Sequence, residues 1–449
     1  MPYRFTVLPP EIMEYAFTFA DPVDIAAVNQ TCKTIYNVTA PLNTHFWRTL
    51  YLCYPFDDPR THFPDAAETF NWRYVFTSRI RAERFPNDIA HLLVTVADCL
   101  RTLPPHSSVL SADLAWVERI VCERREIFHD EWPPTSACSS EDGVEDQEDS
   151  QVDLAIVGPI PKESRMFIRA SLCRLLRPEL ASAAERRRAA RSFVYDLRNY
   201  VETSVWGPLM PGARAPCWKH IDALISVISA NLGDFGFNCP EVLKPPTLRY
   251  GAEALRAYSA VPGRECSTID WAGISGEWMR IHAHVPILKI SDLIRFNRNR
   301  CSPDFFYDGF QEATRMLRMH LVVTGIADEF SADPARPALR FEGKTRAFAS
   351  QAGLERSMRG VVRVMPSGDI RWSWVSSYQG EEDSEEWCAE GIQLGGPGSA
   401  AGVIGTWTGA LHEAGTPALC FGDDSIFDSV RKAILLALSG RSEWPTRTL

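Results

Sequence analysis

The first fifty residues place apolar and polar positions at the spacing of short α-helices. One helix is predicted to begin at Leu8-Pro9-Pro10, because proline is tolerated in the first turn, where backbone donors have no partner within the helix. A second is predicted at Asp21-Pro22, where the aspartate can cap the helix. From there one continuous apolar stripe is expected: Ile25, Val28, Cys32, Ile35 and Tyr36. This pattern predicts a small helical unit over residues 1–52.

Helical periodicity continues over residues 53–264, which we interpret as a helical connector. Asp88 is a candidate cap, and the apolar residues after it recur on one side of a helix: Ile89, Leu92, Leu93, Val96 and Leu100. Further helices are predicted near residues 110–121 and 221–232. Another is predicted around 186–201, where four arginines are expected on the solvated face, with phosphate or acidic-peptide binding as the alternative: Arg186, Arg187, Arg188 and Arg191.

Residues 135–152 interrupt the helical pattern. They contain the acidic run Glu141–Ser150, which has too little apolar surface to offset the entropy lost on ordering. A disordered loop is therefore predicted within the connector. An acidic docking site for a basic partner is the alternative.

The pattern changes near residue 265, from helical spacing to short alternating segments separated by Gly, Pro or acidic turns. Ile370, Trp372 and Trp374 alternate with polar residues after a turn at Pro366–Asp369, and the preceding apolar segment is the predicted partner. Residues 360–378 therefore predict a β-hairpin. Further strands are predicted at 279–289, 316–325, 387–394 and 402–411. At least six strands of this kind indicate a closed barrel or a sandwich.

The predicted fold class is α+β. It comprises the N-terminal helical unit (1–52), the helical connector (53–264) and a C-terminal antiparallel β-barrel-like domain (265–422). A C-terminal helix and tail are predicted for residues 423–449 from these apolar positions: Ile426, Val430, Ile434, Leu435 and Leu438. The last strand and the closure of the barrel stay open at this point.

Two Gly-x-Trp steps lie in the β-rich part, Gly276-Glu277-Trp278 and Gly405-Thr406-Trp407. A glycine near a large indole lets a strand bend over the ring, so both tryptophans are predicted to plug a barrel. Trp372 and Trp374 share one face of their strand. That face is predicted to line a cavity or groove that holds a target peptide or a ligand.

Composition narrows the classes of partner. A net charge of −10 and a pI near 5.6 argue against nonspecific nucleic-acid binding. No uninterrupted apolar run approaches the roughly 20 residues of a membrane helix, and Met1-Pro2-Tyr3-Arg4 lacks the apolar core of a secretory signal. The twelve cysteines include no Cys-x-x-Cys pair, which is typical of reduced thiols. A cytoplasmic or nuclear protein without nucleic-acid or membrane partners is expected.

The sequence holds few signals of catalysis or of cofactor binding. His282 and His284 share a strand face, as in some metal sites, but no third ligand is identifiable. The Gly395-Gly396-Pro397-Gly398 segment lacks the Lys and Ser or Thr of a phosphate loop, so a turn is predicted. A Gly-x-Ser-x-Gly elbow is absent from the sequence. We therefore expect no catalytic residues, no metal and no cofactor, although an intrinsic enzyme ranks as a third hypothesis.

Four short motifs follow one another in the N-terminal unit: Leu8-Pro9-Pro10-Glu11-Ile12, Asp21-Pro22-Val23-Asp24-Ile25, Cys32-Lys33-Thr34-Ile35-Tyr36 and Phe46-Trp47-Arg48-Thr49-Leu50-Tyr51. Their order resembles the F-box, although Tyr36 stands where tryptophan is common. The resemblance implies docking onto the Skp-type adaptor of a cullin-RING ubiquitin ligase. The implied adaptor-binding residues are Leu8, Pro9, Ile12, Ile25, Val28 and Trp47. A helical subdomain packed only on its own protein is the alternative.

The β-rich part, over roughly residues 265–415, resembles the C-terminal half of a fungal (basidiomycete-type) family of F-box proteins. The resemblance is carried by the two Gly-x-Trp steps, the hairpin and the segment Glu390-Gly391-Ile392-Gln393-Leu394. A weaker resemblance to lipocalin-type barrels rests on Gly276 and Trp278. Together these imply the substrate-recognition subunit of a Skp-cullin-F-box ubiquitin ligase, with an adaptor, a cullin and an unknown target as partners. The alternative is a barrel that holds a small apolar ligand, with the F-box used as an adaptor outside ubiquitylation.

Overall fold

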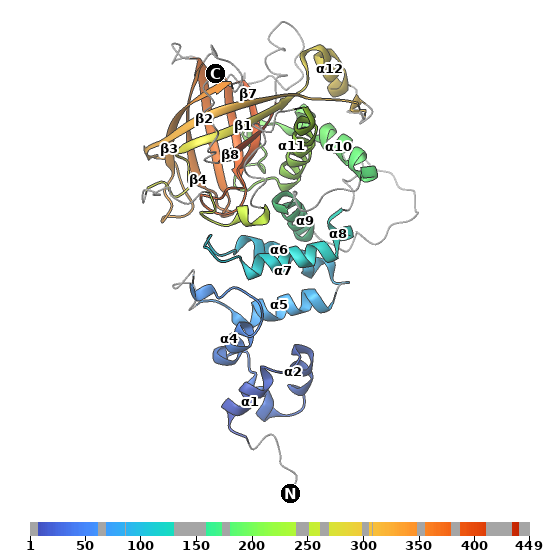
Figure 1. Cartoon of the computed structure of the whole chain (residues 1–449), viewed down its shortest axis with the longest axis vertical. Coiled ribbons are helices and arrows are strands. Elements are labelled where there is room, and N and C mark those ends of the chain that lie inside the picture. Colours follow the sequence, from blue (N-terminus) through green and yellow to red (C-terminus); the bar gives the residue numbers. More distant parts are fainter. Residues whose placement is uncertain are drawn as a thin grey trace. The chain divides into compact units, whose positions relative to one another are not determined.

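The computed structural model divides the chain into two compact units (Figure 1). The N-terminal unit comprises Met1–Ile127 with Val157–Ser164, and the C-terminal unit comprises Phe128–Ile156 with Arg165–Leu449. The predicted connector is thus shared between the two. The structure describes residues 8–61, 69–85, 87–129, 159–172, 180–238, 251–260, 269–298, 305–307, 309–347, 355–378, 387–409 and 433–439. The predicted acidic loop at 135–152 lies outside these residues.

Short, capped helices build the N-terminal unit: α1 (Pro10–Phe17), α2 (Pro22–Val28), α3 (Lys33–Val38), α4 (Thr44–Leu52), α5 (Trp72–Arg84), α6 (Ile89–Arg101) and α7 (Ala112–Glu123). The predicted caps are confirmed, because Asp21 accepts a hydrogen bond from the Val23 amide at 2.9 Å and Asp88 accepts one from the His91 amide at 3.2 Å. The predicted continuous stripe is interrupted, since α2 ends at Val28 and α3 begins only at Lys33.

A small apolar core holds the four helices α1, α2, α3 and α4 together. Its buried side chains are Met13, Phe17, Ile25, Ile35, Val38, Phe46, Trp47 and Leu50. Asn43 caps α4 and also ties it to the other helices, because its amide nitrogen donates to Glu14 and to the Val38 carbonyl, each at 2.6 Å. The Trp47 indole donates to the Ala40 carbonyl at 3.1 Å. The four helices therefore form one packed group.

A buried ion pair organises the rest of the N-terminal unit. Arg79 on α5 donates to Asp113 on α7 at 2.8 Å, and its guanidinium lies 4.5 Å from the centre of the Phe56 ring. Cys99 on α6 lies beside this pair, and burial raises the pKa of its thiol to about 12. The predicted helices near 89–100 and 110–121 are confirmed as α6 and α7.

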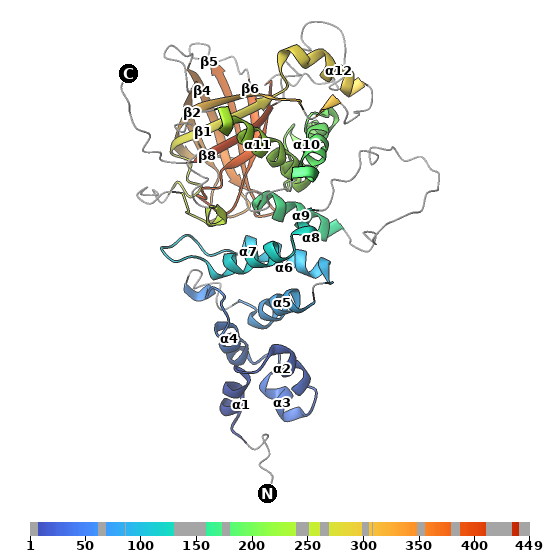
Figure 2. The same ribbon diagram turned by 45° about the vertical axis from the view of Figure 1, so that its right-hand side comes forward.

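The C-terminal unit contains the helices α10 (Leu180–Val194), α11 (Trp218–Asn238) and α12 (Ile290–Arg298), while α8 (Arg125–His129) and α9 (Pro159–Leu172) contribute to both units. Helix α11 packs on α10 and lies along strands β7 and β8 of the barrel (Figure 2). The prediction of a solvated Arg191 is wrong. Its side chain is buried against the carboxylate of Glu312, because a charged group can leave water when a partner satisfies its hydrogen bonds.

Eight antiparallel strands form the barrel: β1 (Gly276–His284), β2 (Ala313–Ile326), β3 (Leu339–Ala347), β4 (Arg356–Val364), β5 (Ile370–Tyr378), β6 (Trp387–Gln393), β7 (Val403–Gly409) and β8 (Ala433–Ser439). Each strand pairs with the next, and β8 pairs back onto β1. The predicted hairpin is confirmed as β4 and β5. Gly368 in its turn has φ +85°, a conformation that favours glycine.

The predicted C-terminal helix is wrong over the residues that the structure describes there. Residues 433–439 form strand β8, which pairs with β7 and β1, so the barrel extends beyond residue 422. The physical reason is that β8 satisfies the backbone groups along two strand edges that would otherwise lack a partner. The earlier positions Ile426 and Val430 lie outside the described residues.

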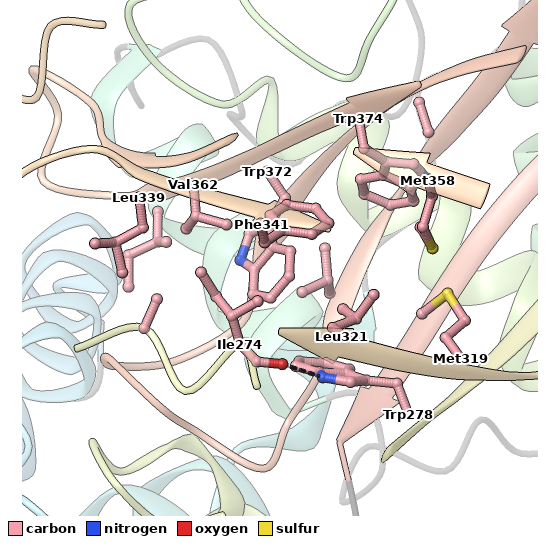
Figure 3. Close-up of a cluster of buried hydrophobic side chains, with 14 of the residues drawn as sticks. Ile274, Trp278, Met319, Leu321, Leu339, Phe341, Met358, Val362, Trp372 and Trp374 are labelled. Atoms are coloured by element: carbon pink, nitrogen blue, oxygen red, sulfur yellow. Dashed lines mark hydrogen bonds between the residues drawn. The ribbon is translucent and has the colours of Figure 1, made fainter. Parts of the chain in front are cut away.

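A tryptophan-rich apolar core lies inside the barrel (Figure 3). Trp278 is buried, its indole donates to the Ile274 carbonyl at 2.7 Å, and its ring meets that of Trp372 edge to face at 5.2 Å. Trp372 in turn donates to Gln393 at 2.9 Å. The backbone of Gly276 has φ +128°, which suits glycine at the point where the chain enters β1. Trp278 is therefore buried in the core of the barrel, whereas Trp407, predicted to have the same role, is only half-buried.

None of the described helices combines the length and the apolar character that a membrane crossing needs.

Candidate functional site

Large apolar side chains gather on the solvent side of the first helices. Those that the structure leaves exposed are Leu8, Ile12, Tyr15, Phe19, Val23, Tyr36 and Leu42. Their exposure ranges from 40% at Leu8 to 93% at Leu42, and the rings of Tyr15 and Phe19 meet edge to face at 5.0 Å. We call these residues the N-terminal apolar surface. Exposed apolar side chains in this number over one short segment favour a site of association.

The six predicted adaptor-binding residues separate into two groups. Leu8, Pro9 and Ile12 are exposed, and Val28 is half-buried. Ile25 and Trp47, by contrast, belong to the core of the unit, where Trp47 contacts the Phe46 ring at 5.2 Å. The structure thus offers the first group to a partner, whereas the buried pair supports the helices from within.

Sequence reasoning missed Tyr15 of α1 as a surface residue, together with Phe19 and Val23 farther along the chain. A signal was present in α1, which carries more apolar residues than one face of a helix can bury. Met13 and Phe17, four residues apart, turn inward, while Ile12 and Tyr15 face solvent. Two apolar faces on one short helix indicate a second contact surface.

The predicted target-binding tryptophans lie inside the barrel. Trp372 is 2% exposed and Trp374 is 5% exposed, and both belong to the apolar core. In Figure 3 Trp374 lies beside Met358, away from Leu339 and Val362. A role for these indoles in binding stays a prediction, and it requires a ligand that enters the barrel.

The interior becomes polar beyond this core. Side chains alternate along a strand, so Arg280 and His282 share the inner face of β1 with Trp278. The Arg280 guanidinium lies 5.7 Å from the Trp374 ring, and the His282 imidazole lies 5.4 Å from the Trp407 ring. Trp407 is only half-buried and packs on Trp387 at 4.4 Å.

Burial sets the protonation of both basic groups. It lowers the pKa of Arg280 to about 9, with a smaller contribution from Arg356, which still leaves the guanidinium charged at neutral pH. Burial, followed by the charge on Arg280, lowers the pKa of His282 well below its usual value. A cation and a neutral imidazole therefore lie side by side in the barrel interior.

The outer face of β2 to β5 forms a second candidate surface. An open groove with a volume of about 860 Å³ runs over these strands, and its charged lining includes Arg318, His320, Glu342, Lys344, Arg346 and Glu355. Ion pairs partly neutralise it, since His320 contacts Glu277 at 2.8 Å and Lys344 contacts Glu355 at 3.6 Å. Such a mixed-charge groove suits a polar segment of another protein.

Metal binding gains no support from the described residues, among which no three His, Cys, Asp or Glu side chains gather as a metal site requires. His282 instead packs on Trp407, and the His284 ring lies 3.0 Å from the Val285 carbonyl. Comparison of the chain with known protein families, with characterised proteins and with solved structures gave no match.

Proposed function

We propose that this protein is the substrate-recognition subunit of a Skp-cullin-F-box ubiquitin ligase. The observation that carries the proposal is the N-terminal apolar surface. The helices that bear it already have a complete core, in which Phe46 and Leu50 are fully buried, so the exposed residues are not needed to hold the unit together. An apolar surface beside a finished core favours a partner protein with a matching groove.

The sequence motifs identify the class of that partner. Leu8, Pro9 and Ile12 are exposed and fall in the first motif that resembles the F-box. The adaptor would bind these residues together with Tyr15 and Phe19, and the adaptor in turn would hold the cullin. Burial of such side chains supplies most of the free energy of association at comparable interfaces.

The C-terminal unit supplies the proposed target site. Because Trp372 and Trp374 are enclosed, the outer groove on β2 to β5 is the better candidate for a protein target. The chain would then act by proximity, since it holds the target near the transfer machinery while its partners perform the chemistry. A cytoplasmic or nuclear location remains an expectation that follows from this role.

Adaptor capture tests the proposal directly. The full chain would be co-expressed with a Skp-type adaptor and a cullin, and the double variant Ile12→Ser with Tyr15→Ser would be compared with the wild type. Capture is expected to fall at least about tenfold, because two anchors are lost from the interface. Leu8→Ala with Pro9→Ala should have the same effect.

The matched control is Val109→Ser with Leu110→Ser. These two apolar residues are 69% and 77% exposed but lie between α6 and α7, apart from the F-box motifs. Both double variants should melt like the wild type, and only the first should lose the adaptor. Wild-type-like capture by the Ile12 and Tyr15 variant would contradict the proposal.

A second candidate function is a ligand-binding barrel whose N-terminal helices serve an adaptor outside ubiquitylation. It is favoured by buried polar atoms of the barrel for which the described part of the chain provides no hydrogen-bond partner, among them Arg280 Nε and Thr345 Oγ1. Co-purification of the cullin with the adaptor would favour the first function. A small molecule extracted from the purified chain, without a cullin, would favour the second.

A further inference from the structure

Four buried polar atoms inside the barrel have no hydrogen-bond partner among the residues that the structure describes: Arg280 Nε, His282 Nε2, Thr345 Oγ1 and Trp407 Nε1. They come from β1, β3 and β7, and each side chain alternates with outward-facing neighbours on its strand. All four groups can donate a hydrogen bond, and the arginine and tryptophan nitrogens can only donate. Buried donors of this kind are stabilised when a ligand supplies the missing acceptor.

Arg280 also differs from Arg191 and Arg371, two other buried arginines of the C-terminal unit. Arg191 pairs with Glu312, and Arg371 pairs with Glu390 at 2.8 Å. Among the described residues, Arg280 has only the Trp374 ring as a partner, while Arg356 repels it. A buried guanidinium without a carboxylate is costly, unless an anion enters and compensates its charge.

The strand register places two indoles on the inner face of the barrel, one on each side of the same strand. Trp374 on β5 and Trp407 on β7 both lie opposite Ala389 on the strand between them. Ala389 is the smallest side chain of this inward-facing trio. Arg280 contacts the first indole and His282 contacts the second, and the two basic residues are neighbours on the inner face of β1.

We propose that the barrel binds a small organic anion whose acidic group pairs with Arg280 and Thr345 and whose planar apolar body lies between Trp374 and Trp407. Arg280 supplies the charge, and Thr345 and the Trp407 nitrogen supply directed hydrogen bonds. A carboxylate and a phosphate monoester share this chemistry. The inference does not rest on the ligase assignment, because it concerns the barrel interior and not the N-terminal helices.

Matched probes test the requirement for an anion. The full chain would be titrated calorimetrically with 2-naphthoate, with 2-naphthyl phosphate and with the neutral 2-naphthamide. At least one acid should bind about tenfold or more tightly than the amide, and the tighter acid identifies the acidic group. Equal affinity for all three probes, or no binding of either acid, would overturn the proposal.

Arg280→Met isolates the charge at nearly constant volume. This variant should lose the preference for the acid, whereas Arg318→Met, at an exposed arginine of the outer groove, should keep it. A preference that survives in Arg280→Met would show that the acid binds elsewhere and would overturn the proposal.

Thermal unfolding of the ligand-free chain gives an independent readout. Arg280→Met should unfold at the same temperature as the wild type or higher, because it removes a buried charge that has no carboxylate partner. Arg191→Met is the matched control and should unfold several degrees lower, since it leaves the Glu312 carboxylate buried without its cationic partner. If Arg280→Met were destabilised as much as Arg191→Met, Arg280 would be a structural group and the anion site would be refuted.

Discussion

Arg191 and Glu312 form a salt bridge that is almost entirely withdrawn from solvent, with side-chain exposures of 1% and 0%. The guanidinium binds both carboxylate oxygens, at 2.8 and 2.6 Å, and lies 5.1 Å from the Phe310 ring. The two residues are 121 positions apart in the chain. The pair therefore fixes α10 to the start of β2 and so links a helix of the C-terminal unit to the barrel.

Breaking this pair should destabilise the C-terminal unit. Arg191→Met leaves the Glu312 carboxylate buried without a partner, so the free energy of unfolding is expected to fall by about 3–5 kcal/mol. Adding Glu312→Leu should recover much of the loss. Urea unfolding followed by tryptophan fluorescence measures both. The control is Arg336→Met, which breaks an exposed pair with Asp333 and should cost only about 0–1 kcal/mol. Equal losses for the two single variants would contradict the assigned role.

The tryptophans of the barrel should differ in their contribution to stability. Trp278→Ala and Trp372→Ala each empty a buried, hydrogen-bonded site, and each should cost about 3–5 kcal/mol. Trp407→Ala should cost clearly less, because that ring is half-buried and its nitrogen finds no hydrogen-bond partner in the described part of the chain. Melting temperatures of the three variants decide the order. A Trp407→Ala variant that is the least stable would reverse it.

His282 should make the barrel sensitive to mild acid. The folded chain holds this imidazole neutral, since burial lowers its pKa, whereas the unfolded chain protonates it near pH 6.5. Its contribution to stability is therefore present above about pH 6.5 and is lost as the pH falls below that value, by up to about 1.4 kcal/mol per pH unit.

The variant His282→Phe keeps a ring beside Trp407 and removes the titration. The difference between its unfolding free energy and that of the wild type should change with pH between about 5 and 6.5. A pH-independent difference for His282→Phe would show that the imidazole is not held neutral.

Thiol labelling should report opening of the N-terminal unit. Cys53 and Cys122 are exposed, whereas burial raises the pKa of Cys99 to about 12, which removes nearly all of its reactive thiolate. With iodoacetamide at pH 8, Cys99 should react more than about 100-fold more slowly than either exposed thiol. Peptide mass spectrometry resolves the sites. Comparable rates for the three cysteines would mean that α6 opens readily.

Local signals in the sequence predicted much of the fold. The cap at Asp88 and the apolar spacing after it located α6, and the turn before Ile370 located the β4–β5 hairpin. Helix caps, hydrophobic periodicity and turn residues are signals that extend over only a few neighbouring positions, so the sequence shows them directly. Strand β3 was not predicted, since Gly343 and its charged neighbours obscure the alternation. Strand β8 was mistaken for a helix, because a short, continuous apolar run fits both.

The candidate sites were predictable only in part. The motif residues Leu8 and Ile12 were identified, but their separation from the buried Ile25 depends on how the helices pack. The burial of Arg191 depends on Glu312, which is far away in the sequence, so no local sequence pattern predicts that burial. The lack of a carboxylate partner for Arg280 among the described residues could not be predicted from local sequence either. It depends on which side chains the other strands of the closed barrel place in the interior.

The pairing of β8 with both β7 and β1 has a consequence for synthesis of the chain. The barrel cannot close until residue 439 has left the ribosome, although β1 is made more than 150 residues earlier. A chain interrupted before β8 would leave β1 and β7 with unpaired backbone groups along their edges, a template for intermolecular strand pairing. Premature termination in this region is therefore expected to yield aggregating protein and not merely a shortened, less active one.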